Sequence, residues 1–192
     1  QIAASLLSPE PLELTNLPAV SDVENMLGVI AQHGAGVSRQ GRSVIVDASA
    51  AFARETSYDT VRKMRATVLV LGPLLARFGK AEVSLPGGCA IGARPVDMHI
   101  KALGQLGADI GIRGGSIVAS VPRSLTGARI VLGSPSVGAT ETAMMAATAA
   151  RGETEIVNAA REPEVMDLAA CLNAMGANIE GAGTHRILVQ GG

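Results

Sequence analysis

The chain has 192 residues, of which 47% are hydrophobic and 17% charged, a balance typical of one ordinary globular domain with a sizeable core. Its formal net charge of −1 provides no strong field for nucleic acid or an anionic membrane, and 2% aromatic residues with no Trp leave almost nothing on which bases stack. We therefore expect neither nucleic acid nor a membrane among its partners.

The chain begins with an apolar helical pattern over residues 1–7 that has no initiator Met, no helix cap and no preceding strand. We therefore expect a fragment of a longer polypeptide. The two cysteines, Cys89 and Cys171, form neither a metal-ligand spacing nor a disulfide framework, which favours a reducing compartment. No secretory signal is present at the start, and the apolar run 67–75 is too short to span a bilayer. A cytoplasmic protein is expected.

Three amphipathic helices, each closed by a Gly-Ala pair, divide the chain into similar parts. Each is preceded by another helix and a strand, and each is followed by two strands that a glycine turn joins. The predicted amphipathic helices are 22–32, 96–106 and 164–175, and the helices predicted before them are 1–7, 60–78 and 138–150. The predicted strands are 12–16, 37–39, 43–46, 81–85, 110–112, 116–119, 129–132, 153–158, 179–180 and 186–189.

These parts form a repeated unit of helix, strand, helix and hairpin, and a short leading strand such as 129–132 precedes the third copy. The alternation of strands and helices predicts an α/β fold in which helices pack against sheets. We therefore predict a single domain, 1–192, of three repeated βαβαββ-type units at about 1–57, 58–127 and 128–192. The first unit lacks its leading strand, which agrees with truncation at Gln1.

The most informative segment is 86–97, with the sequence PGGCAIGARPVD. Its paired glycines permit positive φ and a close approach of the backbone to a ligand, and Pro95 keeps Arg94 out of the helical region. Pro95 is also well placed to be the first residue of a helix. Arg94 and the dipole of that helix are then expected to attract a phosphate or carboxylate beside the Cys89 thiol. Each part also has an ordinary structural explanation. The paired glycines can form a simple turn, Cys89 can be a small buried side chain, and Arg94 can be a solvated loop residue.

The repeats single out this segment as the one that differs between copies. The strand glutamate and the helix-closing glycine are 21 positions apart in the first copy (Glu13, Gly34) and in the third (Glu155, Gly176), but 25 apart in the second. The additional residues fall within 87–94. A structural loop has no need to lengthen in one copy alone, which favours a functional role for this loop.

Five segments of the chain match a known family: 86–97, 64–66, 72–79, 136–140 and 158–164. They resemble the UDP-N-acetylglucosamine enolpyruvyl transferases of peptidoglycan synthesis, over essentially the whole chain. The resemblance implies one domain of a two-domain enzyme, with three βαβαββ-type units in each domain and the active site in the cleft between them. It also implies transfer of the enolpyruvyl group of phosphoenolpyruvate to the sugar 3′-hydroxyl by addition and then elimination of phosphate, with no metal or organic cofactor.

Within this resemblance, Cys89 is the proton donor to the methylene carbon of phosphoenolpyruvate. A thiol with the ordinary pKa of ~8.5 is protonated near neutrality yet able to give up its proton. A neighbouring cation lowers that pKa and a bound substrate phosphate raises it, so its protonation is expected to depend on ligation. The resemblance also implies a covalent phosphoenolpyruvate adduct and alkylation by the epoxide antibiotic fosfomycin.

Further residues are predicted to bind the substrates. Arg94 is expected to hold a phosphate or carboxylate by paired hydrogen bonds, and Arg65 matches a family arginine on the nucleotide side of the cleft. By the resemblance, 95–98 lines the uracil and sugar pocket, while 136–138 opens a helix whose amides and hydroxyl bind the diphosphate. The predicted substrate-binding residues are Arg65, Arg94, Pro95, Val96, Asp97, Met98, Ser134, Pro135, Ser136, Val137 and Gly138.

The chain also departs from the family pattern. Some members carry Lys where this chain has Ser134 and Trp where it has Leu69, so the diphosphate and sugar contacts are expected to be weaker or differently made. The family's Lys-Asn pair lies upstream of Gln1, and its aspartate base and a further anion-binding arginine belong to the other domain. We therefore expect that domain as a partner, and no phosphate release by the 192 residues alone.

Two other functions remain open at this point. The shikimate-pathway enolpyruvyl transferases share the fold but lack this Cys loop, and a non-catalytic domain that binds nucleotide sugars is the second alternative. The other polar residues have structural explanations: Cys171 lies on an apolar helix face, Glu162 and Glu164 suit a helix start, and the three histidines form no metal-ligand group. No metal site is predicted.

Overall fold

The computed structural model describes residues 1–192 except 54, 57–64 and 86–95. Its helices are η1 (Ala3–Leu7), α1 (Ser21–Gln32), η2 (Arg65–Val70), α3 (Leu71–Phe78), α4 (Asp97–Gln105), α5 (Val137–Ala147) and α6 (Pro163–Ala174), where η marks a 3₁₀ helix. Its strands are β1 (Leu12–Leu14), β2 (Gly36–Gln40), β3 (Ser43–Asp47), β4 (Glu55–Thr56), β5 (Lys80–Ser84), β6 (Asp109–Arg113), β7 (Ser116–Ser120), β8 (Arg129–Val131), β9 (Gly152–Val157), β10 (Asn178–Glu180) and β11 (Arg186–Gly191).

The described strands form three separate sheets with one repeated topology. The second sheet has the order β4-β5-β7-β6 and the third the order β8-β9-β11-β10. In both, the first pair is parallel and the other two pairs are antiparallel. The first sheet, β1-β3-β2, repeats the antiparallel part. The predicted α/β fold of three similar units is confirmed.

The three amphipathic helices α1, α4 and α6 end in the same way. Each is followed by a glycine with positive φ, and the amide of the next alanine bonds a carbonyl five residues earlier, which is the Schellman arrangement. These bonds join Ala35 to Ile30 at 3.2 Å, Ala108 to Leu103 at 3.2 Å and Ala177 to Leu172 at 3.0 Å. The Gly-Ala pairs read from the sequence therefore mark true helix ends, and the predicted bounds of all three helices are correct to within one residue.

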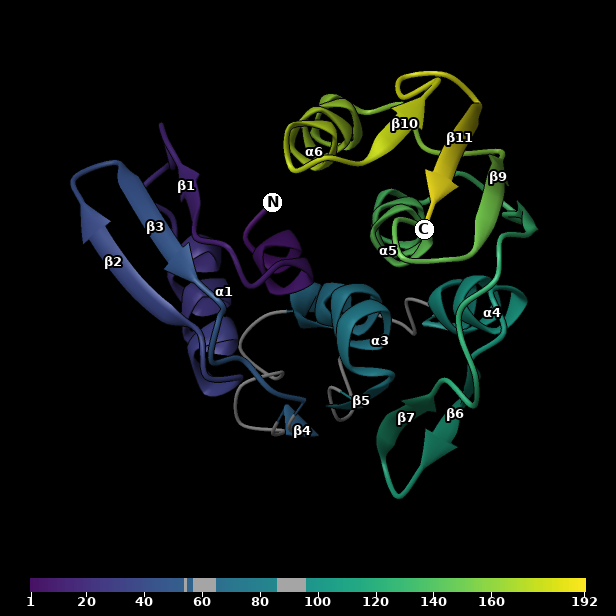
Figure 1. Ribbon diagram of the computed structural model, residues 1–192, viewed down its shortest axis with the longest axis horizontal. Coiled ribbons are helices and arrows are strands. Elements are labelled where there is room, and N and C mark those ends of the chain that lie inside the picture. The colour runs from purple at the N-terminus through teal and green to yellow at the C-terminus, as the bar shows by residue number, and fades with distance from the viewer. Residues whose placement is uncertain (54, 57–64, 86–95) are drawn as a thin grey trace, which may run out of the picture.

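The core lies between the sheets, where η1, α3 and α5 pack together (Figure 1). Small residues in α5 allow its neighbours to approach closely, and most of this helix is buried. A methyl group added at Gly72 of α3 would lie 2.7 Å from the carbonyl oxygen of Thr142 in α5. Only glycine therefore fits at this contact between the two inner helices.

Arg77 of α3 ties the first unit to the second. Its Nη1 donates to the carbonyl oxygens of Leu6 at 3.2 Å, Ser8 at 3.2 Å and Ala48 at 2.9 Å. The guanidinium also lies 4.9 Å from the centre of the Phe78 ring. The matched segment 72–79 thus contains a cation whose role is to hold η1 and the chain after β3 against α3.

Several predicted elements differ from the structure. The predicted helix 60–78 is, in its described part, the 3₁₀ helix η2 followed by α3, and Pro73 explains the late start because it is tolerated only in the first turn of an α-helix. Residues 1–7 contain a 3₁₀ helix, and 138–150 becomes Val137–Ala147. The strand β4 was not predicted, since it has two residues. Among the described residues, no helix combines the length and the apolar character needed to cross a membrane.

Candidate functional site

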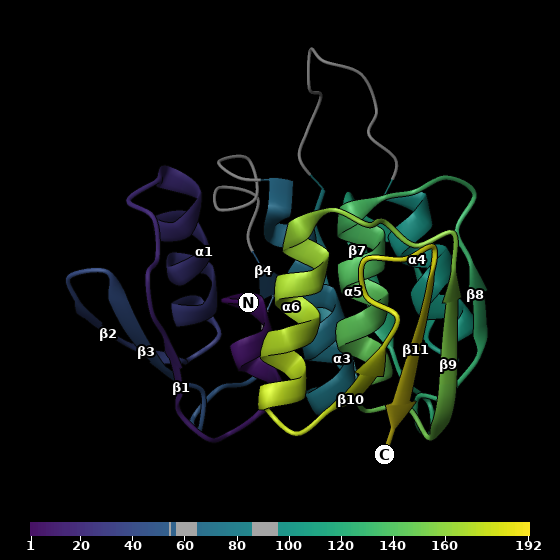
Figure 2. The ribbon, with the colours of Figure 1, turned by 90° about the horizontal axis from the view of Figure 1, so that it is seen from above.

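The first turns of α4, α5 and α6 lie at one end of the helical layer, at the top of Figure 2. This follows from the topology: β8 and β9 run parallel, and each is followed by a helix, α5 and α6, which begins where the strand ends. Asn158, in the left-handed region at φ 60°, closes this edge by donating from Nδ2 to the carbonyl oxygen of Leu132 at 3.0 Å. Helix N-termini that share an edge present amides and positive dipole ends to the same space.

Ser136 caps α5, at the helix start where the resemblance places 136–138. It has an extended backbone, its Oγ accepts from the amide of Ala139 at 3.4 Å, and its carbonyl oxygen accepts from the amide of Thr140 at 3.0 Å. Val137 and Gly138 follow as the half-buried first residues of the helix. A hydroxyl and the first amides of a helix therefore stand together here, which is an arrangement suited to an anion.

Val96 is the N-cap of α4, with φ −74° and ψ −6° and its carbonyl oxygen accepting from the amide of Ile100 at 3.0 Å. The structure assigns the start of α4 to Asp97, and Pro95, which the sequence predicts as the first helical residue, lies outside the described residues. Asp97 is exposed, and Met98 lies half-buried beside Ser134, whose Oγ is 3.9 Å from the methionine Sδ. The structure thus brings together the two predicted segments 96–98 and 134–138.

His99 lies behind these two segments, and sequence reasoning assigned it no role. Its side chain is buried, and its Nδ1 is 2.9 Å from Oγ1 of Thr142. Burial lowers the pKa of His99 to about 4, although the nearby Asp97 carboxylate opposes this shift. A signal was present in the sequence: the buried face of α4 is His99, Ala102 and Leu103, followed by Leu106, so His99 occupies a core position of the helical period.

A second buried bond fixes the segment after β9. The Thr140 hydroxyl accepts from the amide of Ala160 at 3.1 Å, and both residues are fully buried. Because Thr140 is in the first turns of α5, this bond holds the start of the matched segment 158–164 against the capped helix. The family motif at 136–140 therefore has an internal structural role as well as a predicted ligand-binding one.

The remaining predicted residues are placed only in part. Cys89, Arg94 and Pro95 lie outside the described residues, and Arg65 is the first residue of η2. Ser134 and Pro135 are exposed. Their predicted roles remain predictions.

Cys171 is a half-buried residue of α6 that packs against the core. Burial raises the pKa of its thiol, and the Asp167 carboxylate acts in the same direction. A thiol with a raised pKa is a poor nucleophile at neutral pH, so this environment agrees with the structural role predicted for Cys171.

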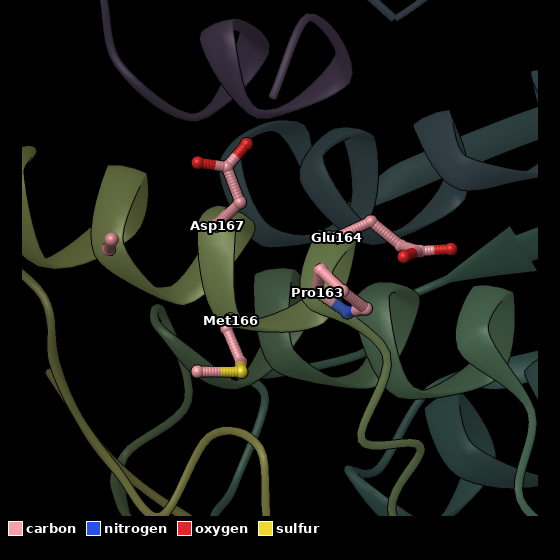
Figure 3. A pocket seen from close by; sticks show the side chains of 5 residues that line it. Pro163, Glu164, Met166 and Asp167 are labelled. Carbon is pink, nitrogen blue, oxygen red and sulfur yellow. The ribbon is translucent and has the colours of Figure 1, made fainter.

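A shallow hollow lies on the outer side of α6 (Figure 3), lined by Pro163, Glu164, Met166, Asp167 and Ala170. Met166 is half exposed there, and Asp167, which also lines the hollow, contacts Gln1. None of the predicted substrate-binding residues lines it. Within the described part of the chain no group of three or more His, Cys, Asp or Glu side chains is arranged to hold a metal ion.

A family model described as EPSP synthase (3-phosphoshikimate 1-carboxyvinyltransferase) matches residues 1–192. Among curated proteins, the chain is 77% identical over 191 residues to UDP-N-acetylglucosamine 1-carboxyvinyltransferase 2 of Mesorhizobium japonicum. It is 56% identical over 201 residues to the UDP-N-acetylglucosamine 1-carboxyvinyltransferase of Rhodospirillum centenum. These alignments cover 100% and 99% of this chain but 46% of each relative. The chain thus spans about half the length of the curated relatives it matches.

Two solved structures are similar to the chain over its whole length. The enolpyruvyl transferase NikO from Streptomyces tendae superposes with a TM-score of 0.84 at 25% identity, and EPSP synthase from Acinetobacter baumannii with 0.72 at 19%. The chain covers 45% and 44% of those structures. The second likeness, at so low an identity, supports the fold alone. Together they confirm the predicted enolpyruvyl transferase fold.

Proposed function

The chain belongs to the EPSP synthase (3-phosphoshikimate 1-carboxyvinyltransferase) family, and on that premise we propose that it supplies the thiol-bearing half of an enzyme of peptidoglycan synthesis. The enzyme transfers the enolpyruvyl group of phosphoenolpyruvate to the 3′-hydroxyl of UDP-N-acetylglucosamine. The observation that carries this choice of acceptor is the 77% identity to a relative named for UDP-N-acetylglucosamine, against 19% to an EPSP synthase structure.

The reaction proceeds by addition and elimination. In the addition, the sugar 3′-hydroxyl gives its proton to the aspartate base expected in the other domain and its oxygen bonds to C2 of phosphoenolpyruvate, while Cys89 delivers its proton to the methylene carbon. In the elimination, the C–O bond to phosphate breaks, a proton of the new methyl group passes to the Cys89 thiolate, the double bond is restored and the proton held by the base leaves with the phosphate. Arg94 holds the phosphate or carboxylate as this charge redistributes, because its planar guanidinium bonds such groups in pairs.

The acceptor is held at the edge where α4 and α5 begin. The capped first turn of α5, with Ser136, Val137 and Gly138, takes the diphosphate at amides and a positive dipole end. Segment 95–98 lines the uracil and sugar, Ser134 and Pro135 border the same space, and Arg65 lies on the nucleotide side. The 3.9 Å contact between Ser134 and Met98 supports this assignment, because it joins the two segments.

The rest of the site belongs to a second domain that faces this one. The chain spans 46% of the relatives named above, which supports one domain of two. We take residues 1–192 as that domain, with repeat units near 1–57, 58–127 and 128–192, and place the protein in the cytoplasm, where both nucleotide sugar and phosphoenolpyruvate are available to it.

The test uses a joined protein, in which this chain replaces the matching part of the Mesorhizobium japonicum relative. With phosphoenolpyruvate present, the joined protein is expected to release phosphate when UDP-N-acetylglucosamine is added and not when shikimate 3-phosphate is added. The reverse preference would establish the shikimate-pathway acceptor instead. Binding of UDP-N-acetylglucosamine without any phosphate release would favour a non-catalytic nucleotide-sugar domain.

A further inference from the structure

Three helices meet at Thr142, directly behind the proposed acceptor-binding turns. Its hydroxyl lies 2.9 Å from Nδ1 of His99 in α4, and its carbonyl oxygen lies so close to Gly72 of α3 that a methyl group there would stand 2.7 Å away. Thr142 is itself fully buried in α5. Its position is therefore fixed by the packing of α3 and α5, and the His99 ring is held to that fixed point.

The adjoining atoms of the same ring edge, Cε1 and Nε2, face the first turn of α5. A methyl group added at Gly138 would lie 3.1 Å from Cε1 and 3.3 Å from Nε2 of His99. These distances are shorter than ordinary carbon contacts, so the ring fills the space up to the Gly138 backbone. His99 thus lies between two points of α5, Thr142 and Gly138, one helical turn apart.

His99 is also only one residue beyond Met98, at the start of α4. Its ring, 7% exposed, spans the space between the first turns of the two helices. Because the ring edge from Nδ1 to Nε2 lies against α5 at two points, the ring links 96–98, on its own helix, to the first turn of α5.

Resting on the proposed function, we propose that His99 is a positioning residue for the acceptor: held by Thr142, its ring sets the spacing between 96–98 and 134–138 that UDP-N-acetylglucosamine requires. The alternative is a histidine that merely fills the core. Different substitutions preserve these two roles of His99. A positioning role needs a polar atom where Nδ1 stands, whereas a core-filling role needs only a side chain of similar volume.

The substitutions separate these cases. Asn places its terminal atoms where Nδ1 stands, whereas the terminal atoms of Gln reach toward Nε2. In the joined protein, His99→Ala and His99→Gln are expected to raise the KM for UDP-N-acetylglucosamine roughly tenfold while kcat changes less than about threefold. Thr142→Ser is expected to stay within about twofold of the unchanged protein, and Thr142→Val to resemble His99→Ala. His99→Asn keeps the bond to Thr142 but not the ring atoms that face Gly138, so it is expected to raise the KM less than His99→Ala does.

A matched control exists elsewhere in the chain. His33 is fully buried, and its Nε2 lies 2.9 Å from Oγ1 of Thr56, but none of its described contacts reaches 96–98 or 134–138. His33→Ala removes the same kind of buried bond. It is expected to lower the urea midpoint as much as His99→Ala does, while the KM for UDP-N-acetylglucosamine stays within about twofold.

A second measurement on the 192-residue chain does not depend on activity. Gly138→Ala is expected to lower the urea midpoint of the chain, because the new methyl group meets the His99 ring. In a His99→Ala background the same change is expected to raise the midpoint, since Ala is the better residue in a helix.

The outcomes distinguish this inference from the proposed function. If the joined protein turns over and all His99 variants, Asn included, raise KM equally, or if His33→Ala raises it as much, the positioning role is overturned and the proposed function stands. If Gly138→Ala has the same effect with and without His99, the inference fails as well. If the joined protein neither binds UDP-N-acetylglucosamine nor releases phosphate, the proposed function itself is overturned, and the positioning role with it.

Discussion

Cys89→Ala in the joined protein is expected to reduce phosphate release from phosphoenolpyruvate and UDP-N-acetylglucosamine by at least about 100-fold. The reason is that the addition step needs a proton at the methylene carbon, and alanine has none to give. Because the substitution leaves the bulk of the acceptor site unchanged, the KM for UDP-N-acetylglucosamine is expected to change much less than kcat. A coupled phosphate assay over a range of acceptor concentrations measures both.

Cys171→Ala is the matched control, since it removes the chain's other thiol from a half-buried position in α6. It is expected to leave phosphate release within about twofold of the unchanged protein. Mass spectrometry after treatment with fosfomycin adds an independent readout, in which Cys89 is expected to be modified faster than Cys171. Equal losses from both substitutions, or faster modification of Cys171, would contradict the role given to Cys89.

The unfolding free energy of the 192-residue chain is expected to depend on pH in opposite directions in two variants, Glu141→Gln and His99→Asn. Burial raises the pKa of Glu141 from 4.5 to about 7, and Glu164 adds to this rise while the amino group of Gln1 opposes it. Burial lowers the pKa of His99 from 6.5 to about 4. Between pH 4.5 and 6.5 the folded state holds a proton on Glu141 that the unfolded state loses, and lacks one on His99 that the unfolded state gains.

The sign of each effect follows from these protons. Folding is favoured by acid through Glu141 and disfavoured by acid through His99, each by up to about 1.4 kcal/mol per pH unit. In the unchanged chain the two slopes largely cancel. Relative to it, His99→Asn is expected to gain about 2 kcal/mol between pH 6.5 and pH 5. Glu141→Gln is expected to lose somewhat less than that, because Glu141 is partly exposed to solvent.

Urea unfolding at pH 5, 5.5, 6 and 6.5 measures these differences, and the double variant serves as the control. Its slope relative to the unchanged chain is expected to be close to zero. If both single variants shift in the same direction, or if neither departs from the unchanged chain, then at least one of the two side chains is not buried in the way described.

Residues that end helices made much of the fold predictable from the sequence. Each Gly-Ala pair closes a helix because only a residue that tolerates positive φ permits the last carbonyls to be satisfied, and this requirement is visible in a single sequence. The same applies to the start of α5, where Ser136 caps the helix. Where the chemistry of a boundary is local, the predicted bounds are correct to within a residue.

Interactions between distant segments could not be predicted. The strand β4 pairs with β5 over two residues, which is too short a stretch for any periodic pattern. Arg77 appears in the sequence as an ordinary basic residue near a helix end, and its three carbonyl partners come from the first unit. His99 gave the periodic signal of a buried position, but its bond to Thr142 spans 43 residues and depends on how α4 and α5 pack.

The same contrast between local features and distant interactions applies to the candidate site. The resemblance located 96–98 and 134–138 separately, and the structure brings them together at the start of two helices. The sequence alone did not provide the distance between these two segments, because that distance depends on buried residues outside both of them. Cys89 and Arg94 rest on the sequence and the family, since they lie outside the described residues.

Phosphate release from phosphoenolpyruvate and UDP-N-acetylglucosamine is best measured side by side for the 192-residue chain alone and for the joined protein. We expect no release above background from the chain alone and sustained, acceptor-dependent release from the joined protein. Release by the chain alone at a comparable rate, or a folded joined protein that releases none, would contradict the claim that this chain provides one half of an enolpyruvyl transferase site.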